Sequence, residues 1–491
     1  MEVPTISPHD RPERGVLLKL LYCAGLALFW VLFLWNVLSR GPYALGVNAA
    51  TFLFLFLGLF IWALRKDGRY ERHDLYWIIP FLLIIASFAI YDNPFIKVVN
   101  ILVLPVFFAL FYNQAHLSDK KSMYWNFGFI IRNSIRALTI FLQLGNAAKT
   151  YLACIVPADR TNKRVIVRVI AGVVIFLAIA LTIVIPLLSS ADIVFSERMR
   201  IVTKWFSTLL STPLVFKIIT FVGLSLLFFS ALAAWGALFT YSGKEENQET
   251  DSIIIGIVLA GVFGIYLLFL WIQLGRLLVG ALPFDFKETE QLVKSGFWQL
   301  LALSVMNILM YFLAYRKTVP FVQKLLSVFT IASLLLLVSA GERMGLYVIY
   351  YGFSYEKFFA SYTVLYCAIL FVWLIAQLFR SARANIVKFL FTLFLWMFAI
   401  VSVFPVEQFI VRANMALHQR NDSRIVLGEM KMLSPDVLAL IKKYRESGTL
   451  DDGGYNWNEW IKKQEQILSE KMWYEWNIMN VVYAVGDHAS Q

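Results

Sequence analysis

The sequence predicts an all-α protein: a polytopic transmembrane helical bundle of about 11 spans, with interfacial helices and a small C-terminal helical domain. Three observations support this fold class. The chain of 491 residues is 59% hydrophobic and only 15% charged, whereas soluble domains carry about 25% charged residues. Its mean hydropathy is +0.68. Apolar runs of membrane-spanning length recur as far as residue 404, and none follows.

The individual spans follow from the rule that about 20 apolar residues cross the hydrocarbon core. The first run is long enough to be a span rather than a cleaved leader. The third and fourth runs are short and are joined only by YDNPFIK (91–97), which predicts a tight helical hairpin. The predicted spans are 18–38, 44–64, 75–91, 95–112, 165–188, 214–240, 252–272, 297–314, 321–340, 358–379 and 385–404.

Lysine and arginine are unevenly distributed among the connections. With the N-terminus inside, the inner connections hold more than twice as many of these residues as the outer ones, chiefly at 65–74 and 113–164. Because positive charge stays on the cytoplasmic side, we expect a multi-pass protein of the cell (inner or plasma) membrane with a cytoplasmic N-terminus and the C-terminus outside. Topology thus accounts for the net charge of +12, and no nucleic-acid partner is predicted.

The stretch 126–156 leaves two interpretations open. Polar residues recur in it at steps of three and four and form a narrow stripe on one helix face. The members of this stripe are Arg132, Arg136, Thr139, Gln143, Asn146 and Thr150. Such a helix lies in the headgroup plane with its cations toward anionic lipid, or it crosses the membrane with the stripe turned into the bundle. If 126–156 crossed the membrane, every later connection would change sides, and lysine and arginine would be almost equally divided between the two faces. The interfacial helix is therefore favoured.

The polar tail is expected to be helical. Ser434 suits an N-cap, with Pro435 at the first helical position. The turn-rich stretch 447–456 ends that helix, and a second helix is expected from Trp457 through Val482. The predicted parts of the chain are an N-terminal tail (1–17), a four-span membrane part (18–112), a basic interfacial or cytoplasmic segment (113–164), a seven-span core (165–404) and a helical C-terminal domain (405–491).

No catalytic or cofactor motif occurs in the sequence. It contains no phosphate-binding G-x-x-x-x-G-K-[ST] loop, no H-E-x-x-H zinc motif and no G-x-S-x-G elbow. The three cysteines and five histidines are scattered without the spacing of a metal site or a disulfide framework. We therefore expect no cofactor and no metal. Enzyme activity is left uncertain but disfavoured.

Asn307 lies near the centre of the predicted span 297–314. A polar side chain at that depth either forms a hydrogen bond to a neighbouring helix or contacts a substrate. The hydrogen bond is the favoured interpretation. No predicted span carries the paired central acids expected of a proton-driven carrier.

Three predicted outer connections, 189–199, 271–300 and 342–357, collect polar residues at the outer face. We treat their polar and turn-forming residues as one candidate cluster. Its members are Asp192, Gln273, Arg276, Asp285, Glu288, Lys294, Arg343, Tyr347, Tyr350 and Gly352.

The third connection, ERMGLYVIYYGFSYEKFF (342–359), predicts a helix, a sharp elbow and a new span. Gly352 suits the left-handed end of a helix, and Ser354 suits the N-cap of the next one. The tyrosines there either form an aromatic belt at the membrane interface or build a polar site. In the second case Arg343 would pair with an outer acid such as Asp192 or Asp285, because a buried arginine needs a partner.

Several stretches of the last 300 residues carry a family resemblance. They are SADIVF (190–195), KETEQLVKSGFWQL (287–300), ERMGLYVIYYGFSYEK (342–357), FIVRANMALHQ (409–419), LSPDVLALI (433–441) and WYEWNIMNV (473–481). The chain resembles the bacterial multi-span family catalogued as domain of unknown function 4173, which is related to the 4153 type. Lys294 stands where that family's turn suggests arginine. The resemblance implies a bacterial membrane protein and transfers no catalytic residue.

Three functions are weighed on this basis. The first is a non-enzymatic envelope scaffold or sensor that uses its outer surface and tail, with another envelope protein as partner besides the lipid bilayer. The second is a transporter or lipid-handling protein with a cleft among the later spans. The third and weakest is a membrane enzyme acting through Asp192, Asp285 or Glu288.

Overall fold

The computed structural model describes most of the chain as helix, and the predicted all-α polytopic bundle is confirmed. It describes residues 14–116, 125, 127–155, 172, 213–236, 251–279, 286–315, 317–380, 385–420, 423–450 and 454–490. Within this part, 8 helices are long and apolar enough to cross a membrane, and two shorter apolar helices join them at Tyr76–Ile90 and Phe297–Phe312. The predicted span 165–188 and the connection containing Asp192 lie outside the described residues.

The first group of helices packs around one aromatic core. It comprises α1 (Arg14–Phe29) with its π-helical continuation (Trp30–Leu34), α3 (Val47–Lys66), α4 (Leu75–Ile90), α5 (Pro94–Ala115), α10 (Pro213–Gly236) and α15 (Ile386–Val403). Phe60 is fully buried there, and its ring centroid lies 4.8 Å from those of Phe108 and Tyr112. These edge-to-face contacts are favourable for aromatic rings, so they fix how α3 and α5 pack.

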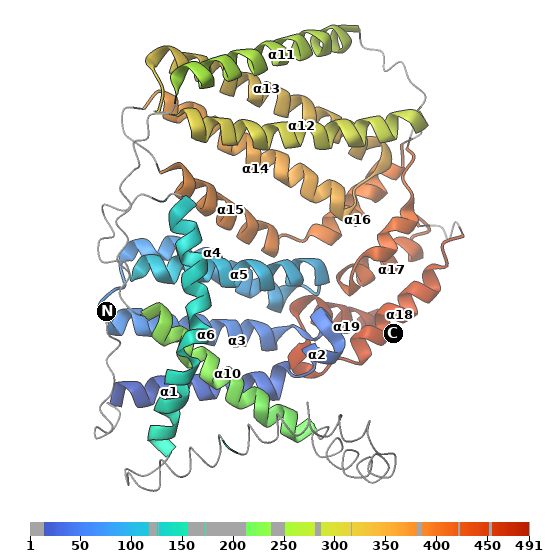
Figure 1. The fold of residues 1–491 in the computed structure, drawn as a ribbon. Coiled ribbons are helices and arrows are strands. Elements are labelled where there is room, and N and C mark those ends of the chain that lie inside the picture. Colours follow the sequence, from blue (N-terminus) through green and yellow to red (C-terminus); the bar gives the residue numbers. More distant parts are fainter. Residues whose placement is uncertain are drawn as a thin grey trace, which may run out of the picture.

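The second group lies beside the first and packs around a separate core (Figure 1). It comprises α11 (Ser252–Val279), α12 (Phe286–Ala314), α13 (Pro320–Tyr351) and α14 (Tyr355–Leu378). Figure 1 shows α15 between α14 and the α4–α5 pair. Helices α10 and α15 therefore pack with the N-terminal helices, although both come much later in the sequence.

Helix α6 (Phe127–Ile155) differs in direction from these spans. In Figure 1 it runs across α1, α3 and α5 rather than along them. Arg136 on α6 is buried and donates to the carbonyl oxygens of Ala234 (3.3 Å) and Trp235 (3.0 Å) at the end of α10. A cation near the last carbonyls of a helix stabilises that end. One member of the predicted polar stripe thus anchors α6 to α10.

The predicted hairpin between the third and fourth spans is confirmed. Helix α4 ends at Ile90, and α5 begins at Pro94, where the missing N–H costs no hydrogen bond. The Asn93 side chain accepts a hydrogen bond from Ile96 N (3.0 Å) and caps α5. The turn between them is only three residues long, so its one acid, Asp92, is held in a fixed position.

The helices after residue 405 share a core and lie at one end of the spans, beside the α4–α5 turn and the α13–α14 elbow (Figure 1). We refer to them as the C-terminal domain. Its helices are α16 (Val406–His418), α17 (Leu438–Glu446), α18 (Trp457–Ser469) and α19 (Ile478–Ser490), with 3-10 turns at Leu427–Met432, Pro435–Val437 and Trp473–Glu475. The expected cap at Ser434 is present, since its Oγ accepts a hydrogen bond from Asp436 N (3.3 Å).

The single helix expected from Trp457 through Val482 is wrong. It is two helices, α18 and α19, separated by residues 470–477. Lys471 and Glu475 in this interval turn inward and bind groups of the first membrane bundle. These tertiary bonds compensate for the helical hydrogen bonds lost between the two helices.

The predicted elbow is confirmed in detail. Helix α13 ends at Gly352, which has φ 73° and ψ 173° and donates its N–H to Val348 O (2.8 Å). Ser354 then caps α14 through a bond from Lys357 N (3.4 Å). Above the elbow, Asn414 of α16 accepts from Phe353 N (2.6 Å) and donates to Phe353 O (2.9 Å). The elbow is therefore bound directly to the C-terminal domain.

Gly352→Ala should destabilise the protein by about 1–3 kcal/mol, because its backbone conformation is almost restricted to glycine. The added Cβ would also lie 2.7 Å from Asn414 Oδ1. The melting temperature of the purified protein in detergent measures the loss. Gly345→Ala, in α13 with nothing within 4 Å of its Cβ, is the matched control and should be neutral or stabilising. Equal melting temperatures for both variants would contradict the role of the elbow.

Candidate functional site

The predicted outer-face cluster is only partly described by the structure. Asp192 and Asp285 lie outside the described residues, so their pairing with Arg343 stays a prediction. Gln273 and Arg276 lie on α11, and Glu288 and Lys294 on α12, in stretches whose side chains are likewise not described. The remaining members are all on α13 or at its end: Arg343, Tyr347, Tyr350 and Gly352.

These elbow residues bind the start of α14 and the C-terminal domain. The Lys357 Nζ lies 4.5 Å from the Tyr347 ring centroid and donates to Tyr351 O (3.0 Å). Such a cation–π contact is favourable when partly desolvated, and Tyr347 is buried. The carbonyl of Tyr350 accepts from Arg424 N (2.9 Å). Arg343 is half-buried on the same helix.

Asn307 has a protein partner within the second bundle. Its Oδ1 accepts a hydrogen bond from the Tyr266 hydroxyl of α11 (2.6 Å), and the residue is buried. This is the helix-to-helix bond that the sequence favoured. Interhelical bonds of this kind contribute on the order of 1 kcal/mol.

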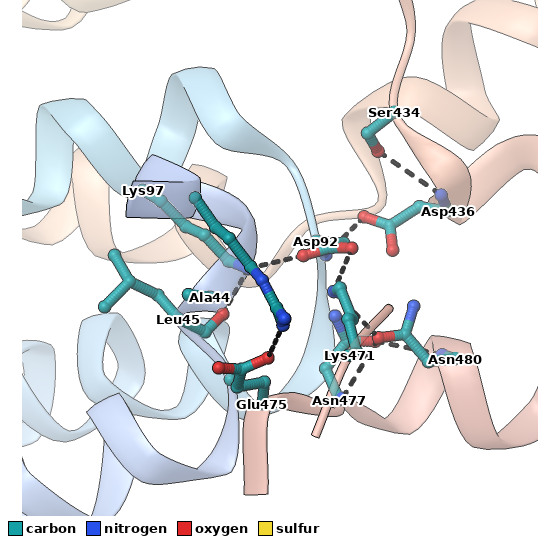
Figure 2. Close-up of polar contacts among 12 residues, drawn as sticks. Ala44, Leu45, Asp92, Lys97, Ser434, Asp436, Lys471, Glu475, Asn477 and Asn480 are labelled. Carbon is teal, nitrogen blue, oxygen red and sulfur yellow. Dashed lines mark hydrogen bonds and ion pairs between the residues drawn. The ribbon is translucent and has the colours of Figure 1, made fainter. Parts of the chain in front are cut away.

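A buried ionic junction joins the first bundle to the C-terminal domain, and the sequence did not point to it. Asp92, in the α4–α5 turn, is 0% exposed. Its Oδ1 lies 2.6 Å from Lys97 Nζ, its Oδ2 forms an ion pair with Lys471 Nζ, and its N–H donates to Asp436 Oδ2 (2.6 Å). Figure 2 shows these contacts converging from α5 and from the C-terminal domain.

The two lysines of this ionic junction are also satisfied by other groups. Lys97 Nζ donates to the carbonyl of Leu45, just before α3, and Lys471 Nζ donates to Asn480 Oδ1 (3.2 Å) of α19. Burial lowers the pKa of Lys471, and the charge of Asp92 opposes this effect. A buried ion pair is tolerated only with such additional hydrogen bonds, so Asp92 holds three chain segments at one point.

Two further acids lie behind the ionic junction, at the start of the tail. Burial, together with the charge of Asp92, raises the pKa of Asp436 to about 7. Burial and the nearby Asp436 raise the pKa of Glu407 well above its usual range. Glu407 accepts from Ser434 N (3.0 Å) and from the hydroxyls of Ser434 and Tyr355. Glu407 thus links the tail to the first turn of α14.

A second polar contact reinforces the docking beside α3. Glu475 is fully buried and accepts from Asn36 Nδ2 (2.7 Å) and Arg40 Nη1 (3.0 Å). The N–H of Val47, the first residue of α3, donates to Trp476 O (3.0 Å). A Cβ on Gly46 would lie 2.5 Å from that same oxygen and closer still to the backbone of Glu475. The absence of a side chain at Gly46 is what lets the tail backbone approach the span.

The ionic junction attaches the C-terminal domain to the first bundle and encloses little open space. Asp92 is paired with both lysines, and the pocket at Tyr91, Phe404 and Asp436 has a volume of only about 10 Å³. Among the described residues, no group of three or more His, Cys, Asp or Glu is arranged to hold a metal ion. The absence of a cofactor remains a prediction.

Asp92→Asn should cost about 3–5 kcal/mol of stability, since it leaves two buried ammonium groups without their carboxylate. Thermal unfolding in detergent, followed by the tryptophan fluorescence of the protein, measures this loss. Lys462→Met, which removes an exposed charge on α18, is the control and should stay close to the wild type. A melting temperature for Asp92→Asn equal to that of the control would exclude a structural role of the junction.

The raised pKa of Asp436 predicts a pH dependence of stability. The unfolded chain releases this proton near pH 4, whereas the folded protein retains it up to about pH 7. The contribution of Asp436 to stability should therefore fall as pH rises from about 4 to about 7 and then level off. Asp436→Asn should flatten the part of the slope due to this residue. The control Glu459→Gln changes an exposed acid and should leave the slope of stability against pH unchanged. If Asp436→Asn had the same slope as the wild type, the raised pKa of Asp436 would be contradicted.

The comparison with known proteins agrees with a membrane protein without assigned activity. Residues 78–444 match the family described as "Domain of unknown function (DUF4153)". The sequence motifs favoured the related 4173 type, and it is the 4153 type that this match shows. No curated protein and no solved structure matches the chain. The match begins within α4 and ends within α17, so it includes Asp92, Lys97 and Asp436. The chain belongs to the DUF4153 family.

Proposed function

We propose that the protein is a non-enzymatic membrane scaffold or sensor whose C-terminal domain holds two helical bundles together and presents a surface to an envelope partner. The observation that supports this proposal most strongly is the double attachment of the domain. It binds the first bundle through Asp92 and Lys471 and the second through Asn414 and the elbow. Each attachment uses buried polar groups, which are costly to separate.

The alternative, a transporter or lipid-handling protein with a cleft among the later spans, finds less support. A carrier that alternates between two open states must move its helical groups relative to one another. Here the C-terminal domain bridges both groups, and Asn307, the central polar residue of the later spans, is bonded to Tyr266. We therefore rank the scaffold above the carrier.

For the topology we propose that the C-terminal domain lies outside and the N-terminus in the cytoplasm. The predicted outer turns at 91–94 and 351–354 both contact the domain, as an alternating topology requires. We also propose that α6 lies in the membrane plane on anionic lipid. Its direction in Figure 1 and its exposed Arg132 and Lys149 support that orientation.

Cysteine labelling checks this orientation. Met432→Cys, on the exposed surface of the C-terminal domain, should react in intact cells with an impermeant maleimide, whereas Glu71→Cys, at the opposite ends of α3 and α4, should react only after permeabilisation. Both variants are made in a protein in which Cys154 is replaced by serine. That protein retains the buried Cys23 and Cys367, and its labelling is the background to subtract. The reverse pattern would invert the topology.

In-cell photo-cross-linking tests the scaffold directly. A photo-cross-linking amino acid in place of Met432, which is 84% exposed, should give one discrete adduct with another envelope protein. The same amino acid in place of Leu102, exposed on α5 within the membrane, should give no such adduct. Two results together would favour the carrier instead. One is that neither residue 432 nor the exposed residue 426 gives a protein adduct, and the other is that liposomes containing the protein take up solute.

A further inference from the structure

The tail segment that carries Lys471 also forms a pocket, with a volume of about 590 Å³, against the start of α3. This volume is in the range of small-molecule and cofactor sites. Its apolar lining residues are Val47, Trp473, Trp476, Ile478, Val481 and Val482. The pocket lies next to the ionic junction, and Lys471 belongs to both.

The walls of the pocket are both apolar and exposed. Ile478, Val481 and Val482 lie on one face of α19 at helical spacing and are 46–55% exposed. Trp473 is 76% exposed. Contiguous apolar surface of this kind marks a binding site for protein, ligand or membrane.

The position of the pocket points to the bilayer as the source of its ligand. Val47 is the first residue of span α3, so the pocket opens where the span begins. The same face of α3 continues through Phe54, which is 59% exposed within the span. Tryptophans favour the boundary between hydrocarbon and headgroups, where Trp473 and Trp476 would then lie.

The polar groups at the pocket exclude a charged headgroup as the occupant. Among the described residues that line the pocket, Lys471 is the one cation, and its Nζ is already bound by Asp92 and Asn480. The remaining lining side chains are apolar apart from Asn477. A phosphate in the pocket would lack a cation to compensate its desolvation, whereas a hydrocarbon chain meets walls of its own polarity.

We propose that this pocket binds the acyl chain of a bilayer phospholipid, which enters along the exposed face of α3. The bound chain packs against the stem of Lys471, beside its ion pair with Asp92. Lipid binding therefore stabilises the docked C-terminal domain. The inference concerns a structural lipid and holds for a scaffold and for a carrier alike.

A phosphatidylcholine with a photoreactive group at the end of its acyl chain tests the proposal. The purified protein is incorporated into nanodiscs of this lipid, irradiated and mapped by peptide mass spectrometry. The peptide 472–482 should carry lipid adducts. Val481→Asp should lower this labelling at least about tenfold, because a carboxylate is strongly disfavoured beside hydrocarbon. Met432→Asp, on an exposed residue of the same domain outside the pocket, should leave labelling unchanged.

A second variant separates loss of the lipid from loss of the fold. Val481→Trp fills the pocket without adding charge, and it should lower labelling of 472–482 while adducts on Phe54 persist. Adducts on Phe54 with none on 472–482 in the wild type would overturn the proposal. So would protection of 472–482 in a particle whose native mass is that of a dimer, since a second copy would then cover the pocket.

Discussion

The carboxylate of Asp92 is the group on which the arrangement of the molecule depends. It is fully buried in a three-residue turn, and it is bonded to a lysine of its own bundle and to a lysine of the C-terminal domain. An isolated charge in that position would be very unfavourable. These contacts stabilise the docked tail, because undocking would take from Asp92 its ion pair with Lys471 and the hydrogen bond from its N–H to Asp436.

This requirement explains several otherwise separate features. Helix α18 ends early so that Lys471 and Glu475 can reach the membrane bundle. Gly46 lacks a side chain where the tail backbone passes. Asn414 and Glu407 bind the elbow and the start of α14 from the same domain. The domain thus connects two bundles whose apolar cores are distinct, and this connection is the basis for proposing a scaffold.

Much of the fold could be predicted from the sequence, because span length, the Asn93–Pro94 helix start and the Gly352 elbow are local signals. The ionic junction could not be predicted. Asp92 and Lys471 are 379 residues apart, and each alone resembles an ordinary charge at a span end or on a polar helix. Lys97 is apparent only as a cation near the start of a span. The break between α18 and α19 was missed for the same reason, since tertiary bonds outweigh a continuous helical pattern. The sequence instead predicts a polar cluster of ten residues around Arg343, and two of its acids, Asp192 and Asp285, lie outside the described residues.

A double-mutant cycle on Asp92 and Lys471 measures whether their ion pair holds the C-terminal domain on the first bundle. The four proteins are the wild type, Asp92→Asn, Lys471→Met and the double variant, each unfolded in the same detergent. If the ion pair holds the domain on the bundle, the double variant will lose less stability than the sum of the single losses, with a coupling of about 1–3 kcal/mol. Additive losses would show that the two residues act independently and that their ion pair does not hold the domain in place.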